Sequence, residues 1–101
     1  MSPIVRECVL IRDMYTCVRC GRATGNMQIA HRLKNGSGTI EWLQKKFPDK
    51  KKGWLQDNIV DHPLNLVTTC CLRCNDSMNI FNNEVERELL VNKIYSIANC
   101  S

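Results

Sequence analysis

The sequence predicts a single α+β domain, and three observations lead to this expectation. The chain has 101 residues, of which 44% are hydrophobic and 24% are charged, as in one globular domain. Short segments with a strand pattern alternate with longer segments with a helix pattern. Seven cysteines include two Cys-x-x-Cys pairs. Because a core this small is only marginally stable, we expect a bound metal ion to stabilise the domain.

Helices are expected at both ends of the chain. Residues 2–13 begin with Ser-Pro, the pattern of an N-cap followed by a first-turn proline. The last helix, at about 83–98, begins with Asn83 and carries Glu86 three positions later, as in a capping box. The predicted apolar faces comprise Ile4, Cys8 and Ile11 in the first helix and Val85, Leu89 and Ile94 in the last.

Two short strands and two further helices are expected between these ends. Residues 27–31 and 65–69 are short and apolar, as strands are. Between them, Thr39 is predicted to cap a helix that Pro48 ends. Residues 71–81 are predicted to form the helix after the second strand. The apolar side of the middle helix comprises Ile40, Leu43 and Phe47.

The two Cys-x-x-Cys pairs are the strongest chemical signal in the sequence. Two such pairs present four sulfur atoms, which complete a closed tetrahedral Zn²⁺ site of the structural kind. Gly21 follows the first pair and suits the tight turn of a chelating loop. Cys70 is a rival to Cys71, but the two-residue spacing favours Cys71, so Cys70 is expected to point the other way. The predicted zinc ligands are Cys17, Cys20, Cys71 and Cys74.

Other uses of the cysteines fit the sequence less well. A disulfide framework is disfavoured because the count is odd and no secretion signal precedes the domain. A redox Cys-x-x-Cys needs a βαβ setting that the pattern lacks, and four thiols without metal leave two matched spacings to chance. Cys8, Cys70 and Cys100 are expected to be buried thiols that pack as small apolar side chains.

Charge and hydropathy limit the partners and the location. The formal charge is +4, and a zinc ion with four thiolates adds about −2, which leaves a mildly basic protein that permits nucleic-acid binding. No apolar run approaches the roughly 20 residues that span a bilayer. Arg6 and Glu7 interrupt any signal-peptide pattern, so we expect a cytoplasmic protein without a membrane partner, monomeric or weakly dimeric.

Four polar residues lie between and beside the cysteine pairs. His31 ends the first predicted strand and Asn65 begins the second. Asn75 and Asn79 are one helical turn apart on the following helix, so they share a face. A strand-loop-strand-helix unit would bring all four residues together. Each also has an ordinary explanation, as a strand-end, turn or exposed helix residue.

The segments RDMYTCVRCG (12–21), IAHR (29–32) and NLVTTCCLRCN (65–75) resemble the HNH endonuclease family. The resemblance spans about residues 11–80. It implies a small zinc-stapled ββα-metal (HNH) domain with flanking N- and C-terminal helices, and residues 1–101 would form one nuclease domain.

The resemblance also implies roles for the polar residues. His31 matches the general base, and Asn65 matches the central asparagine that helps to fix the loop behind it. Asn75 matches the third position, which ligates the catalytic cation, and Asn79 occupies the place of a further ligand. An amide oxygen suits Mg²⁺ or Mn²⁺, so one of these is the expected catalytic cation, beside the structural Zn²⁺.

The sequence departs from the family pattern in two respects. Many members carry a metal-ligating Asp, Glu or His before the base, where this chain has Ala30. The missing ligand would come from His62, from Asp61 or from water. The second cysteine pair also lies one residue further from Asn65 than is commonest, and the doubled cysteine at 70–71 absorbs the difference.

Basic residues gather near the proposed base and in residues 35–60, a long insert between the two strands. They are expected to bind DNA phosphates, although a merely solvated face is the competing explanation. Trp42 and Trp54 flank the cluster and are expected to pack in the core. The candidate DNA-binding residues are Arg32, Lys34, Lys45, Lys46, Lys50, Lys51, Lys52 and Arg73.

The function expected from these features is metal-dependent hydrolysis of DNA phosphodiester bonds, by nicking or double-strand cleavage. A catalytically inactive zinc-stapled DNA-binding module is the alternative, and Ala30 favours it. A zinc-ribbon protein-interaction module is a third reading without a specific feature in its support. So compact a nuclease suits a phage or mobile element, which would place it in the host cytoplasm.

Overall fold

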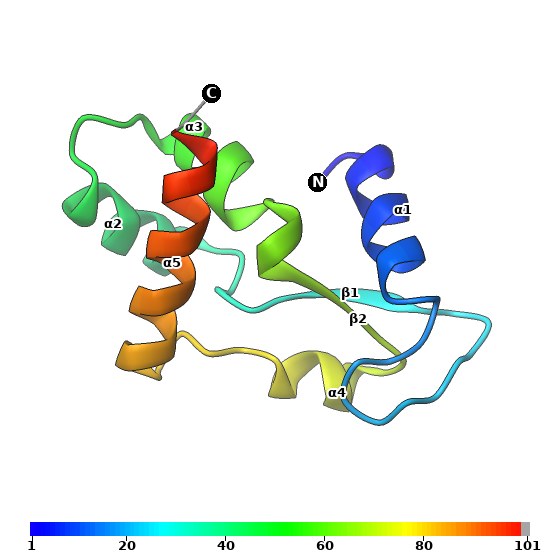
Figure 1. The fold of residues 1–101 in the computed structure, drawn as a ribbon. Coiled ribbons are helices and arrows are strands. Elements are labelled where there is room, and N and C mark those ends of the chain that lie inside the picture. The colour runs from blue at the N-terminus through cyan, green and yellow to red at the C-terminus, as the bar shows by residue number, and fades with distance from the viewer. Residues whose placement is uncertain (100–101) are drawn as a thin grey trace.

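The computed structural model describes residues 1–99, and Figure 1 shows their arrangement. None of the helices in this part of the chain has the length and apolar character needed to cross a membrane. The elements, in chain order, are α1 (Pro3–Arg12), β1 (Gln28–His31), α2 (Ser37–Lys46), α3 (Lys52–Leu55), the π-helical turn η1 (Gln56–Val60), the 3₁₀ turn η2 (Pro63–Asn65), β2 (Leu66–Thr69), α4 (Leu72–Ser77) and α5 (Glu84–Ala98).

The two strands form one antiparallel sheet, and α4 follows β2 after a short turn. Gln28 pairs with Thr69 at one end of the sheet and His31 pairs with Leu66 at the other. Helix α4 packs against both strands. The predicted α+β class is confirmed, and the strand-strand-helix order places residue 31 and helix α4 in one unit.

The buried side chains form two separate clusters. The larger one joins α2, α3, η1 and α5, which lie together on one side of the molecule in Figure 1. Trp42 and Trp54 pack against this cluster, as the sequence predicts. The smaller cluster lies at the other side and comprises Leu10, Cys17, Met27 and Cys74. Residues 35–60 therefore build much of the main core.

The terminal helices begin where the sequence predicts, but their buried faces differ. The Ser2 hydroxyl accepts a hydrogen bond from the Val5 amide at 3.2 Å, and the Asn83 side chain accepts one from the Glu86 amide at 3.1 Å. In α1 the predicted face is wrong, because Ile4 is 77% exposed. Only the C-terminal half of α1 contacts the rest of the chain closely enough to bury side chains, and these are Val9 and Leu10.

In α5 the predicted face is correct only in its last member. Val85 and Leu89 are exposed, whereas Val91 and Ile94 are fully buried. The helix packs against η1, and this contact reaches its middle and C-terminal turns.

The two middle helices differ from their predicted boundaries. Helix α2 begins at Ser37, so Thr39 lies inside it, buried, and donates its hydroxyl hydrogen to the Lys34 carbonyl at 2.6 Å. Helix α4 ends at Ser77 rather than at residue 81. The chain leaves the helix there because the Ile80 amide donates a hydrogen bond to the Arg32 carbonyl at 2.8 Å.

Candidate metal centre and active site

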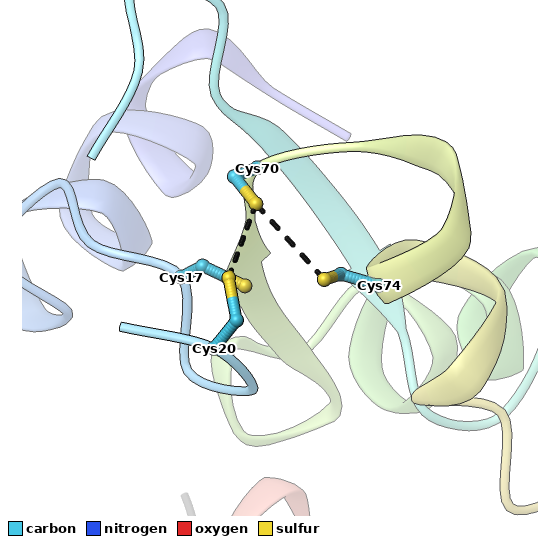
Figure 2. Close-up of side chains that lie close together, drawn as sticks. All are labelled: Cys17, Cys20, Cys70 and Cys74. Atoms are coloured by element: carbon cyan, nitrogen blue, oxygen red, sulfur yellow. Dashed lines mark hydrogen bonds between the residues drawn. The ribbon is translucent and has the colours of Figure 1, made fainter. Parts of the chain in front are cut away.

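Four cysteine side chains converge at the end of the hairpin, where the loop after α1 meets the turn after β2 (Figure 2). The sulfur atoms of Cys17, Cys20, Cys70 and Cys74 all lie within 4.8 Å of one another. A tetrahedral zinc ion with Zn–S bonds of about 2.3 Å separates its sulfurs by about 3.8 Å. The observed separations, 3.3 Å for Cys20 to Cys70 and 4.0 Å for Cys70 to Cys74, are close to that value. These residues therefore fit a zinc ion.

The structure replaces one predicted ligand, because Cys70 joins the cluster in place of Cys71. The backbone is extended at Cys71, with φ −160° and ψ 168°, so successive side chains point to opposite sides. Cys71 is exposed, whereas Cys70 faces Cys20 and Cys74. The expectation that Cys70 points away is therefore wrong. Cys8 is exposed rather than buried, and Cys100 lies outside the described residues.

The backbone near the first cysteine pair is shaped for chelation. Met14 and Tyr15 adopt left-handed conformations, with φ 56° and φ 51°, and turn the chain sharply after α1. Gly21 has φ 78°, in line with the turn expected of it. The Gly21 amide donates a hydrogen bond to the Cys17 carbonyl at 2.9 Å, which closes the loop around both sulfurs.

The electrostatic environment favours thiolate at the cluster. Burial alone would raise the pKa of the Cys17 thiol, but backbone amides of Cys20, Arg19 and Cys70 lower it to about 6. The guanidinium of Arg19 lies 3.7 Å from the Cys74 sulfur. Because metal binding requires deprotonated sulfur, both features favour a bound cation.

A pocket of about 370 Å³ lies beside the sheet and α4. Three residues that the sequence singles out, His31, Asn75 and Asn79, line this pocket together. Sequence reasoning missed Asp76, whose position next to Asn75 was the available signal. The other lining residues are Ile29, Lys34 and Asn35.

His31 is held by a carboxylate from the far end of the insert. Its Nε2 lies 2.9 Å from Oδ1 of Asp61, and the two side chains are only 17% and 14% exposed. Asp61 also accepts a hydrogen bond from Gln56 at 3.2 Å and lies 3.4 Å from the Met1 amino group. Burial alone would raise the pKa of Asp61, but these partners hold it below its ordinary value. Asp61, an alternative cation ligand in the sequence, instead binds the proposed base.

Asn65 is fully buried and connects the two segments that carry this pair. Its Oδ1 accepts the Leu33 amide at 2.7 Å, and its Nδ2 donates to the carbonyls of Leu33 at 3.1 Å and Val60 at 2.8 Å. Leu33 lies two residues after His31, and Val60 directly precedes Asp61. The side chain therefore fixes the loop behind His31.

The two asparagines of the pocket use their side chains differently. Asn75 donates from Nδ2 to the Ile29 carbonyl at 3.3 Å and to Gln28 Oε1 at 3.4 Å, and these bonds do not use its Oδ1. Asn79 is exposed, and its Oδ1 accepts the Phe81 amide at 2.9 Å, in a turn after α4. Asn75 thus has an oxygen available to the pocket, and Asn79 has a local structural role.

His62 does not join the pocket lining, contrary to its tentative assignment as a cation ligand. Its Nδ1 accepts the Leu64 amide at 3.1 Å and caps η2. Burial lowers the pKa of His62. The side chain is therefore engaged in local structure.

The candidate DNA-binding residues are dispersed. Lys34 lines the pocket and lies 4.7 Å from the centre of the Phe81 ring. Lys46 forms an ion pair with Glu88, and Lys50 lies 4.5 Å from the Trp54 ring. Arg32 is half-buried, and the remaining four, Lys45, Lys51, Lys52 and Arg73, are exposed.

Comparison of the chain with protein-family models, curated proteins and solved structures finds no match.

Proposed function

We propose that this chain is a small metal-dependent DNA endonuclease of the HNH type. The observation that carries the proposal is the shared pocket of His31 and Asn75, directly beside the cysteine cluster. The order of the elements, strand, strand and helix, is the order that the sequence resemblance implies. The proposal needs a proton acceptor, an electrophile and a place for phosphate, and the pocket offers a residue for each.

His31 is the proposed general base. With Nε2–H donated to Asp61, Nδ1 keeps its lone pair and accepts a proton from water. The water oxygen then attacks phosphorus, and the bond from phosphorus to the 3′ oxygen breaks, so that the phosphate stays on the 5′ side, as in the related family. General-base assistance of this kind contributes about 10²- to 10⁴-fold to a rate.

Asn75 and Asp76 are the oxygen donors of the pocket that would hold Mg²⁺ or Mn²⁺. A bound cation would act as a Lewis acid on the phosphate and stabilise the leaving oxygen. Few protein ligands suffice for such an ion, because Mg²⁺ usually keeps several waters and binds substrate phosphates. Lys34 adds a positive charge at the pocket wall, where a phosphate would lie.

A zinc-stapled DNA-binding module without cleavage is the competing proposal. Ala30 favours it, because that position offers no ligand and its side chain is 99% buried, away from the pocket. In that case the cysteine cluster would remain and the pocket would be a relic.

The two histidines of the chain provide a matched test of the nuclease proposal. We expect the wild-type protein to convert supercoiled plasmid to nicked or linear DNA with Mg²⁺ or Mn²⁺, and EDTA to stop the reaction. His31→Asn should lower the rate by about 10²-fold or more, because the proton acceptor is lost. His62→Asn should cleave normally, since an asparagine at that position can still accept the Leu64 amide.

Both variants should keep bound zinc, measured by mass spectrometry, and the melting temperature of the wild type. Equal activity of the two variants would reject His31 as the base. Wild-type protein that binds DNA but cuts with no divalent ion would favour the binding module.

A further inference from the structure

A second hollow lies beside the cysteine cluster, and arginines line it. Its volume is about 370 Å³, and Arg19, Arg22 and Arg73 form its basic wall. All three arginines are exposed. Among residues 1–99, the side chains of Arg22 and Arg73 form no ion pair or hydrogen bond, whereas Arg19 donates to the Cys74 sulfur. Two guanidinium groups are thus free to bind an external anion.

The segments around this hollow carry no acidic residue. Residues 14–40 and 62–75 contain neither Asp nor Glu. These segments form the cysteine loops, the hairpin and the start of α4. Five basic side chains lie in them, namely Arg19, Arg22, Arg32, Lys34 and Arg73. This half of the molecule therefore attracts polyanions without local compensation.

The lysines of the insert lie in a different electrostatic setting. Residues 41–60 hold five lysines, but also Glu41, Asp49 and Asp57. Two of the lysines are engaged within the protein, Lys46 by Glu88 and Lys50 by Trp54 and Asn99. The insert is thus the weaker candidate for a phosphate-binding surface.

Helix α4 connects the arginine hollow to the pocket. Arg73 and Cys74 line the hollow, and the next two residues, Asn75 and Asp76, line the pocket. We propose that Arg22 and Arg73 bind the phosphate backbone of duplex DNA and position the strand across α4. The identity of the partner rests on the proposed nuclease function, whereas the location of the contact rests on the charge distribution.

The test compares two double variants that each remove two positive charges. Arg22→Gln/Arg73→Gln changes the hollow, and Lys45→Gln/Lys51→Gln changes exposed lysines of the insert that form no printed-sequence neighbour to it. Both are made in a His31→Asn background, so that no DNA is cut. Binding of a short fluorescent DNA duplex is measured by anisotropy over a range of KCl concentrations, without added divalent ions.

We expect the arginine pair to weaken binding on the order of tenfold and to reduce the salt slope by about 2, one contact for each phosphate lost. The lysine pair should stay within about twofold of its background. Zinc content and melting temperature should match in all proteins, which excludes unfolding as the cause.

A larger loss in the lysine pair, or no loss in the arginine pair, would overturn the proposal. An RNA duplex bound more tightly than DNA would reassign the hollow to RNA. Binding through the arginines without cleavage by wild type would reject the nuclease and keep this inference. Cleavage that both double variants retain at low DNA concentration would do the reverse.

Discussion

Buried polar contacts around His31 give the candidate site its fixed geometry. Asn65 satisfies three backbone groups of Leu33 and Val60 with one amide. Asp61 in turn holds the imidazole through Nε2. Unsatisfied groups in such a buried network each cost about 1–3 kcal/mol, so the arrangement is stable only when complete. His31 therefore has one supported orientation.

Replacing Asp61 by Asn tests this support. The amide keeps the size of the carboxylate but presents a donor as well as an acceptor, so the ring can bind in the wrong tautomer. We expect kcat for plasmid cleavage to fall about 10- to 100-fold with little change in KM. The ¹⁵N signals of His31 should report a changed tautomer mixture.

Asp57→Asn is the matched control, because Asp57 is exposed on the same π-helical turn and does not contact His31. It should cleave as wild type. A normal kcat and unchanged ¹⁵N signals in Asp61→Asn would show that the carboxylate does not orient the base.

At the scale of elements, the turn from β2 to α4 decides which cysteines meet. Strand β2 ends at Thr69, and the extended residue Cys71 begins α4 as its N-cap. Cys70 and Cys74 then lie on the same side as the first cysteine pair. A change of one residue in this turn would exchange the ligands.

Two serine variants test this ligand set. Cys70→Ser should lose most of the bound zinc and melt at a lower temperature, because a structural zinc site contributes about 10–16 kcal/mol of binding energy. Cys71→Ser should retain one zinc per chain, measured by mass spectrometry, since its sulfur lies outside the cluster. Zinc loss in Cys71→Ser alone would restore the ligand set predicted from spacing.

At the scale of the whole molecule, the chain combines two units with different sources of stability. The helical unit of α2, α3, η1 and α5 has its own apolar core. The hairpin unit has a small cluster in which two of the four buried residues are cysteines of the proposed zinc site. Asp13 connects α1 to the hairpin through the Thr68 amide at 2.9 Å. The hairpin unit therefore depends on metal more strongly.

Removing zinc should affect the two units unequally. After treatment with a strong chelator, we expect amide hydrogen exchange to rise most in the loop at 14–21, in β1, β2 and α4. Exchange in α5 and η1 should change least, because their buried side chains contact no cysteine of the cluster. A uniform rise over both units, followed by mass spectrometry, would show one cooperative unit instead.

The sequence by itself determined the local features of this protein. The helix starts at Ser2 and Asn83, the two strands and the turn at Gly21 follow from capping, alternation and backbone freedom, which act over a few residues. Spacing also indicated a cysteine cluster and the shared pocket of His31 and Asn75.

Only the tertiary structure decided the choice of Cys70, the carboxylate behind His31 and the buried faces of α1 and α5. Asp61 meets His31 across 30 residues of chain, and no periodic pattern records such a contact. Side-chain direction at a strand-to-helix turn likewise depends on the φ and ψ angles of single residues. Local propensity places the elements, and their packing decides which side chains meet.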